Sequence, residues 1–249
     1  MTKEISGLAK KEIEIQREYY AKTSAQYDTM HFNDKDEHYF ALRFLEGVID
    51  FYDIKTILDL GAGTGRVAQY FKDKNPALKV ISIEPVSELR EIGHLKGLSK
   101  DELIDGDATN ISFHDNEFDL VCEFGVLHHI KTPEKVVKEM LRVSRIGLFI
   151  SDTNNFGQGS FLSRSIKQFI NALGLWKLAY LINTKGKGYT ISEGDGLGYS
   201  YSVFNNYKLI SEHCQTHILN TVGAGVNPYK TAPHVALLGI KNSHLASQR

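Results

Sequence analysis

Short apolar runs alternate with amphipathic stretches through the middle of the chain. Such runs, bounded by turn residues, are typical of buried strands. They predict strands over residues 56–60, 79–84, 102–105, 118–122 and 147–152, and helical patterns separate most of them. This alternation predicts a doubly wound α/β fold with a mostly parallel sheet, in which ligands bind at the carboxyl ends of the strands.

The two ends of the chain frame this alternating part. Apolar positions predict helices within residues 4–30 and over 38–50, and near the other end a helix over 205–214 precedes two closing strands. These strands are expected over 217–222 and 234–240, the last one antiparallel to its neighbour. We expect one domain, divided into N-terminal helices (1–50), a ligand-binding core (51–152), an insertion (153–204) and the closing strands (205–249).

The insertion breaks the alternation. Residues 161–182 predict an apolar helical hairpin, broken at Gly174, and the segment GKGYTISEGDGLGYSYS follows it. An insertion next to the ligand-binding edge of a sheet, with a glycine-rich loop, predicts a lid that selects the substrate.

Composition narrows the class of protein. The 249 residues are 42% hydrophobic, which is enough for a substantial core. With 29 basic and 30 acidic residues the net charge is −1, which argues against a broad surface for nucleic acid or anionic lipid. Cys122 and Cys214 suggest neither a disulfide framework nor a zinc site. We find no signal-peptide or membrane-spanning pattern, so a soluble, cytoplasmic protein without stable membrane insertion is expected.

The stretch ILDLGAGTGR, residues 57–66, carries the strongest motif. An apolar run leads into glycines at 61, 63 and 65, which permit backbone angles closed to other residues and a close approach of a ligand. The pattern differs from the dinucleotide fingerprint G-x-G-x-x-G, because Arg66 fills its last position. Asp59 would repel a pyrophosphate but would suit a cation, so a cationic cofactor is expected.

Strand, Asp, Gly-x-Gly-x-Gly and helix resemble the first motif of class I S-adenosylmethionine-dependent methyltransferases. The resemblance implies S-adenosylmethionine as the cofactor. Glu84 comes roughly 20 residues after the loop, where a carboxylate accepts hydrogen bonds from a ribose diol, although NAD enzymes also have one there. In this family the acid after the third strand and its neighbour contact adenine. The expected cofactor-binding residues are Tyr20, Tyr27, Asp59, Gly61, Ala62, Gly63, Gly65, Glu84, Pro85, Asp107, Ala108 and Glu123.

The tyrosines in this set come from YYAKTSAQYD, which resembles the helix that closes over the cofactor in this family. Simple packing of their rings is the alternative for both. The acids at 59, 84 and 107 have an alternative role as turn or cap residues, but their register with one glycine loop favours the cofactor.

Residues 118–150 resemble the small-molecule branch of the family, which includes methyltransferases of ubiquinone and menaquinone synthesis. Ser144-Arg145-Ile146-Gly147 replaces the Lys-Pro-Gly-Gly turn usual there. His128 and His129 follow the fourth predicted strand, and an imidazole with a pKa of about 6.5 can accept a proton from a hydroxyl. They are the candidate catalytic residues, and packing or loop hydrogen bonding is their alternative role.

A magnesium site is a weaker interpretation. Glu123, Asp152, Asn154 and Asn155 fall at strand ends, as in catechol-type O-methyltransferases, but the same spacing suits a polar pocket. We therefore expect no metal. The Asn/Asp-Pro-Pro-Tyr motif of amide and base N-methylation does not follow the fourth strand, so no nucleic-acid partner is expected.

The insertion supplies the candidate substrate contacts. Its phenols and carboxylates, Asp195 among them, suit a small polar substrate such as a sugar or a phosphorylated precursor of a polysaccharide, methylated on oxygen. The expected substrate-binding residues are Asn154, Tyr189, Glu193, Tyr199 and Tyr201. An exposed β-hairpin or a homodimer contact is the alternative for this segment.

Two other functions stay open. A quinone or lipid C- or O-methyltransferase could use the apolar hairpin to lie on a membrane, although the low cationic density of the hairpin argues against it. A cofactor-binding sensor or partner subunit would keep the fold without catalysis.

Overall fold

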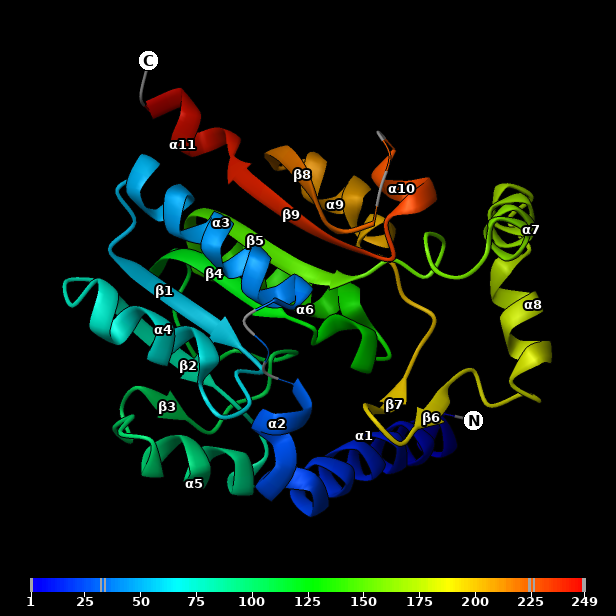
Figure 1. The fold of residues 1–249 in the computed structure, drawn as a ribbon, viewed down its shortest axis with the longest axis horizontal. Helices are drawn as coiled ribbons and strands as arrows, with labels where there is room; N and C mark the ends of the chain where they lie inside the picture. Colours follow the sequence, from blue (N-terminus) through cyan, green and yellow to red (C-terminus); the bar gives the residue numbers. More distant parts are fainter. Residues whose placement is uncertain (1, 32, 34, 224, 226, 248–249) are drawn as a thin grey trace.

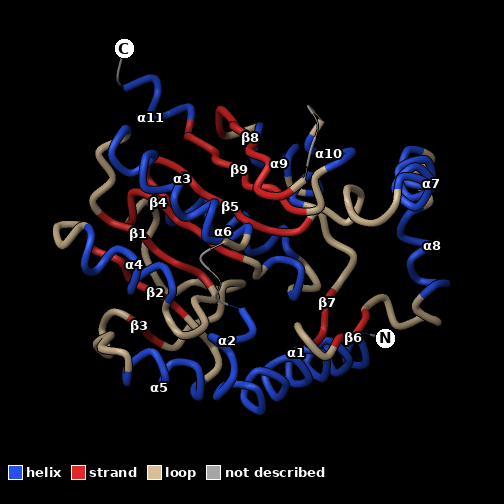
Figure 2. The backbone as a smooth tube through the Cα atoms, viewed as in Figure 1, coloured by secondary structure: helices blue, strands red, loops and turns tan. Residues whose placement is uncertain are grey.

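The computed structural model describes residues 2–31, 33, 35–223, 225 and 227–247. Its main sheet has seven strands in the order β3-β2-β1-β4-β5-β9-β8 (Figures 1 and 2). The strands are β1 (Thr56–Leu60), β2 (Lys79–Ile83), β3 (Leu103–Ile104), β4 (Phe118–Phe124), β5 (Ser144–Thr153), β8 (Cys214–Val222) and β9 (His234–Lys241).

All neighbouring strands of the main sheet pair in parallel except where β9 takes part. β9 is antiparallel to both β5 and β8, as expected for the last strand. The predicted α/β fold, a doubly wound and mostly parallel sheet, is confirmed. Several boundaries differ from prediction by one or two residues, and two strands begin three residues earlier than expected: β5 at Ser144, which pairs with Phe118 next to a bulge, and β8 at Cys214. The helix expected over 205–214 is shorter, since α9 covers only Tyr207–Ser211.

Helices cover both faces of this sheet. The helices of the described residues are α1 (Thr2–Thr23), α2 (Tyr27–His31), α3 (Glu37–Phe51), α4 (Arg66–Lys74), α5 (Ser87–Leu95), α6 (Pro133–Val143), α7 (Phe161–Ala172), α8 (Trp176–Asn183), α9 (Tyr207–Ser211), α10 (Pro228–Thr231) and α11 (Asn242–Ser247), of which α7 and α8 lie beside the sheet and not on it (Figure 1). The single helical region expected within 4–30 is split, because the 3₁₀ turn Ser24–Gln26 separates α1 from α2.

Two buried clusters account for the apolar strands. Ile57 of β1 packs with α3 and α4 on one face, whereas its neighbour Leu58 packs with α6 on the other. Successive side chains of a strand point to opposite faces, so a strand covered on both sides must be apolar throughout. Figure 1 shows α3 and α6 on opposite faces of the sheet.

The insertion lies to one side of the sheet. It contains the helices α7 and α8, broken at Gly174 with φ +72° as predicted, and a small two-stranded sheet of β6 (Thr190–Ser192) and β7 (Gly196–Gly198). We call residues 190–198 the β6–β7 hairpin. It packs against α1, which reaches it from the other end of the chain (Figure 2). The role of this insertion as a substrate-selecting lid stays a prediction.

Among the described residues, we find no helix with both the length and the apolar character that crossing a bilayer requires.

Candidate active site

The glycine loop joins β1 to α4 with its backbone in the left-handed region. Gly61 has φ +64°, Gly63 has φ +58° and Gly65 has φ +87°. A Cβ on Gly61 would lie 2.6 Å from Val126 Cγ2, and one on Gly63 would collide with the ring of Tyr27. Both the backbone angles and the close approaches therefore require glycine here.

A cavity of about 350 Å³ lies beside this loop. It lies at the carboxyl ends of β1, β2 and β4, and α1 covers it with Arg17 and Tyr20. The structure brings together seven of the predicted cofactor residues on its lining: Tyr20, Tyr27, Gly61, Glu84, Pro85, Asp107 and Ala108. Gly63 and Gly65 support the loop, and Ala62 lies within it, but none of the three lines the cavity.

Glu84 lines this cavity and is held by two hydrogen bonds from the backbone. Its Oε2 accepts a hydrogen bond from the Gly63 N–H at 2.9 Å, and its Oε1 accepts one from the Val86 N–H at 2.9 Å. Burial raises the pKa of Glu84 to about 7, although these two hydrogen bonds oppose the shift. A carboxylate can accept further hydrogen bonds, so Glu84 stays available to two neighbouring hydroxyls.

Asp107 lies at the exposed rim of the same cavity. Its Oδ1 accepts hydrogen bonds from the backbone N–H and the hydroxyl of Thr109, at 2.8 and 2.7 Å. Its Oδ2 lies 3.7 Å from Arg17 of α1. Asp107 is thus positioned by its own turn and faces the helix that covers the cavity.

Two predicted cofactor acids do not line the cavity. Asp59 is 2% exposed and accepts a hydrogen bond from the Cys122 thiol, with 3.7 Å between Oδ1 and Sγ, and burial raises its pKa to about 8. Glu123 is fully buried, and its Oε1 has no hydrogen-bond partner among the described residues. Burial and the charge of Asp152 raise the pKa of Glu123 well above its usual range. The roles predicted for these two acids in holding the cofactor stay predictions.

A second, larger cavity of about 940 Å³ adjoins the first. The two share the lining residues Tyr20, Tyr27, Phe124, Gly125 and Tyr199. Polar side chains from α2, α3, α7 and α8, from the end of β5 and from the β6–β7 hairpin line the larger cavity. One molecule in each cavity would therefore meet the other beside Phe124 and Gly125.

His128 lies on the wall of the larger cavity between two carboxylates. Its Nδ1 lies 2.7 Å from Asp152 Oδ1, and its Nε2 lies 3.0 Å from Asp195 Oδ2. Burial alone would lower the pKa of His128, but Asp152 and Asp195 together raise it well above its usual range. The two carboxylates therefore stabilise the protonated form of His128, and Asp195 bonds to its Nε2.

His129 lines the smaller cavity and bonds to both the β6–β7 hairpin and α1. Its Nδ1 lies 2.6 Å from the Leu197 carbonyl oxygen, and its Nε2 lies 2.9 Å from the Tyr20 hydroxyl. These contacts favour the loop-bonding role over a catalytic one for His129, whereas the geometry of His128 suits proton transfer.

Gln16 was missed by the sequence reasoning, together with Asp195 as a partner of the histidines. Gln16 of α1 donates to the Asp195 carbonyl at 3.2 Å and accepts from the Leu197 N–H, so it ties α1 to the β6–β7 hairpin. The one available signal was its helical spacing from Ile13 and Tyr20, which places Gln16 on the same side of the helix as these two residues.

The predicted substrate residues divide into two groups. Tyr199 and Tyr201 line the larger cavity, and the Tyr199 hydroxyl donates to Glu12 Oε2 at 2.8 Å. Tyr189, Glu193 and Asn154 do not line either cavity.

Asn154 links segments of the fold through its side-chain hydrogen bonds. Its amide donates to the carbonyls of Pro228, Tyr229 and Ala232 at 3.1, 2.9 and 2.9 Å, and its Oδ1 accepts from Ser202. These bonds also remove Asn154 from the magnesium alternative. The part of the chain that the structure describes has two groups of at least three acidic or histidine side chains close enough to share an ion: Glu37, His38 and His234, and His128, His129 and Asp195.

The central part of the chain matches a known protein family. Residues 58–150 match the methyltransferase domain family. A demethylmenaquinone methyltransferase of Thermotoga maritima is 36% identical over 87 residues, which are 35% of this chain and 38% of that protein. A phosphatidylethanolamine N-methyltransferase of Cereibacter sphaeroides is 30% identical over 124 residues, 47% of this chain and 61% of that protein. The chain spans about two fifths of the length of the menaquinone-type relatives it matches.

Solved structures extend the likeness over the whole fold. A SAM-dependent methyltransferase of Thermotoga maritima, described as a possible histamine N-methyltransferase, has a TM-score of 0.60 at 17% identity and covers 90% of this chain and 99% of its own. A plantazolicin methyltransferase solved in complex with SAH has a TM-score of 0.58 at 19% identity, covering 97% and 100%. These comparisons confirm the resemblance named from the sequence and support S-adenosylmethionine as the predicted cofactor.

Proposed function

We propose that this chain, a class I methyltransferase by its fold and its central sequence, transfers a methyl group from S-adenosylmethionine to a small polar acceptor. The observation that carries the proposal is the meeting of the two cavities at Tyr20, Tyr27, Phe124 and Gly125. A donor held beside the glycine loop and an acceptor in the larger cavity would be aligned there. Methyl transfer depends mainly on such alignment and on the exclusion of water.

The residues of the smaller cavity fit the cofactor. Its volume of about 350 Å³ is within the range of ligand pockets. Glu84 offers oxygen acceptors for a ribose diol, and Asp107 and Ala108, the pair that the family resemblance assigns to adenine, line the same cavity. Gly61 brings the main chain to the cavity wall at a point where Val126 leaves no room for a side chain. When bound, S-adenosylmethionine supplies an electrophilic methyl group on a sulfonium.

The larger cavity supports an acceptor that carries a hydroxyl. Asp152 orients His128 through Nδ1, so Nε2 faces the cavity as a base once an acceptor hydroxyl takes the place of Asp195. Removal of Asp195 from this nitrogen lowers the pKa of His128, so Nε2 can release its proton to water and then accept the proton of the acceptor hydroxyl. A displacement of the β6–β7 hairpin, which carries Asp195, would therefore couple acceptor binding to base activation.

We favour a sugar or a phosphorylated metabolite as the acceptor, methylated on oxygen. Polar and cationic side chains on the lining, including Arg66, Lys167 and Asn155, support this choice. A quinone or lipid acceptor is the second candidate, favoured by the menaquinone-type relatives and by the exposed apolar side chains of α7 and α8. No nucleic-acid partner is proposed.

The test combines binding with turnover. We expect calorimetry to show that S-adenosylmethionine and SAH bind to the purified chain and that NAD does not compete. Release of SAH should then depend on an acceptor from a panel of sugars, sugar phosphates, lipid headgroups and quinones. His128→Asn should reduce turnover while SAH binding stays unchanged. Absence of cofactor binding would refute the proposal, and binding without turnover of any acceptor would favour the sensor alternative.

A further inference from the structure

Three polar side chains of α7 point toward the protein. Lys167 donates to the carbonyls of Asn155 and Gln158, and Gln168 donates to the Phe156 carbonyl at 3.0 Å. Asn171 donates to the Tyr229 hydroxyl at 3.0 Å. The contacts that attach α7 to the rest of the molecule are therefore polar.

Most large apolar side chains of α7 and α8 point away from the protein. Neither helix has a buried residue. Phe161 is 78% exposed, Phe169 66% and Ile182 70%. The exposed apolar set, which we call the hairpin face, is Phe161, Leu162, Ile166, Phe169, Leu173, Leu175, Leu178, Leu181 and Ile182.

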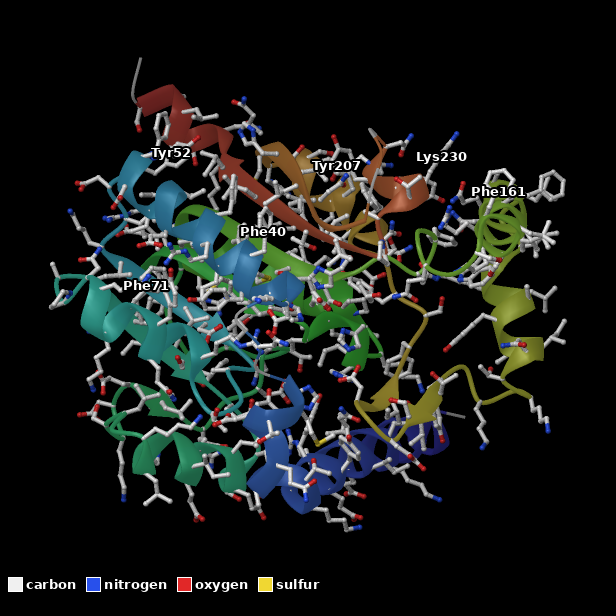
Figure 3. All side chains as sticks on the ribbon, in the orientation of Figure 1. Phe40, Tyr52, Phe71, Phe161, Tyr207 and Lys230 are labelled. Carbon is white, nitrogen blue, oxygen red and sulfur yellow. The ribbon has the colours of Figure 1, made fainter. Side chains whose placement is uncertain are left out.

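This orientation is the reverse of that of an ordinary surface helix, whose apolar stripe faces the core. In α7 the stripe at 162, 166, 169 and 173 follows helical spacing, so one continuous side of the helix is apolar and exposed. A contiguous exposed apolar surface of this kind marks an interaction site. Figure 3 shows Phe161 at the outer edge of the molecule.

The charges around the hairpin face indicate the kind of surface that it would bind. Residues 153–192 contain no Asp or Glu, in a chain whose net charge is −1. The basic residues of this segment are Arg164, Lys167, Lys177, Lys185 and Lys187. Lys177, Lys185 and Lys187 are exposed, and so is Lys230 of α10, which packs beside α7 (Figure 3). Apolar side chains flanked by cations suit an anionic lipid surface.

We propose that the hairpin face docks on an anionic membrane surface and that the sugar or phosphorylated acceptor favoured above is carried as the polar headgroup of a lipid in that membrane. The second part rests on the proposed function. Trp176, Tyr180 and Asn183 of α8 line the larger cavity, so a docked hairpin places that cavity next to the lipid headgroups. The polar lining admits a headgroup and leaves the acyl chains in the bilayer.

A second copy of the chain fits this face less well. In a twofold dimer the same surface of both copies meets, so the basic side chains of two hairpins would be brought together without acidic partners from the segment. An anionic membrane neutralises those charges. The net charge of the whole chain and the few cations of residues 161–182 argued against lipid binding in the sequence. The fold adds cations from outside the helices: Lys185 and Lys187 follow α8, and Lys230 lies on α10 beside α7.

Vesicle flotation tests the proposal with the full chain. We expect the wild type to float with vesicles of phosphatidylglycerol mixed equally with phosphatidylcholine and to bind pure phosphatidylcholine vesicles more weakly. The variant Phe161→Ser/Phe169→Ser should lose flotation. Lys177→Gln/Lys185→Gln/Lys187→Gln should weaken it roughly a hundredfold, because each lysine near an anionic surface strengthens binding about fivefold. Phe51→Ser is the matched control, since Phe51 is 81% exposed on α3, away from the hairpin face.

Light scattering and SAH binding complete the test. The wild type should be monomeric without vesicles, and every variant should bind SAH as the wild type does. Failure of the wild type to float would overturn the docking proposal, and so would a dimer that the Phe161→Ser/Phe169→Ser variant dissociates. If flotation persists but headgroup analogues give no turnover, the acceptor assignment fails. If SAH does not bind while flotation persists, the proposed function fails and docking stands.

Discussion

Replacement of Glu84 by glutamine perturbs the cofactor side of the site with little change in shape. Glutamine keeps one oxygen as an acceptor for the Gly63 or the Val86 N–H, but it turns an NH₂ group toward the other. It also removes the charge offered to a ribose diol. Hydrogen bonds to charged groups contribute about 1.5–3 kcal/mol each. We expect a loss of about 3 kcal/mol of binding free energy, which is roughly a hundredfold increase in the Kd for SAH.

Measuring the Kd for SAH by calorimetry at several pH values tests this prediction most directly. Because burial raises the pKa of Glu84 to about 7, the affinity of the wild type should rise with pH as the carboxyl ionises, whereas that of Glu84→Gln should not. The matched control is Glu88→Gln, an exposed acid at the start of α5 that does not line the cavity. Equal Kd values for Glu84→Gln and the wild type, with the fold intact, would refute the assignment of the cavity to the cofactor.

Other parts of the structure give three further predictions. Asp195→Ala should lower the pKa of His128, measured by NMR of the imidazole nitrogens, because it removes the acceptor at Nε2; an unchanged pKa would show that Asp152 alone sets it. Asn154→Ala should lower the free energy of unfolding by about 3 kcal/mol, measured by urea denaturation, because three backbone carbonyls lose their donor. A loss below about 1 kcal/mol would contradict the structural role of Asn154. Burial raises the pKa of Asp59 from 3.8 to about 8, so the native state binds this proton more tightly than the unfolded state. The stability of the cofactor-free protein should therefore fall as the pH rises from 3.8 to about 8, and the fall should be smaller in Asp59→Asn. If the urea midpoint of the wild type stays the same over this pH range, the reasoning fails.

The cofactor side of the site could be predicted from the sequence because its determinants are local. A strand, a glycine turn and a helix are contiguous along the chain, and each acid follows its own strand. Parallel strands of a doubly wound sheet end at one edge, so Glu84 and Asp107 reach the same cavity as Gly61. The strand pattern itself was readable because burial on both faces makes each strand apolar throughout.

The acceptor side was predictable only in part. Tyr199 and Tyr201 were expected there and line the larger cavity, but Asn154, predicted as a substrate contact, lies in a buried network of backbone carbonyls. Polar residue types are the same in a pocket and in a buried network. Composition could not distinguish the two, because the difference lies in which partners surround the side chain.

The sequence by itself determined the sheet, the glycine loop and the acids at the strand ends, since each follows from neighbours along the chain. The tertiary structure alone decided the contact of His128 with Asp195, which lie 67 positions apart, and the link of Gln16 to the same hairpin. It also decided the outward direction of the hairpin face. Helical periodicity shows that a helix has an apolar side, but only packing against the rest of the molecule determines whether that side faces the core or the surroundings.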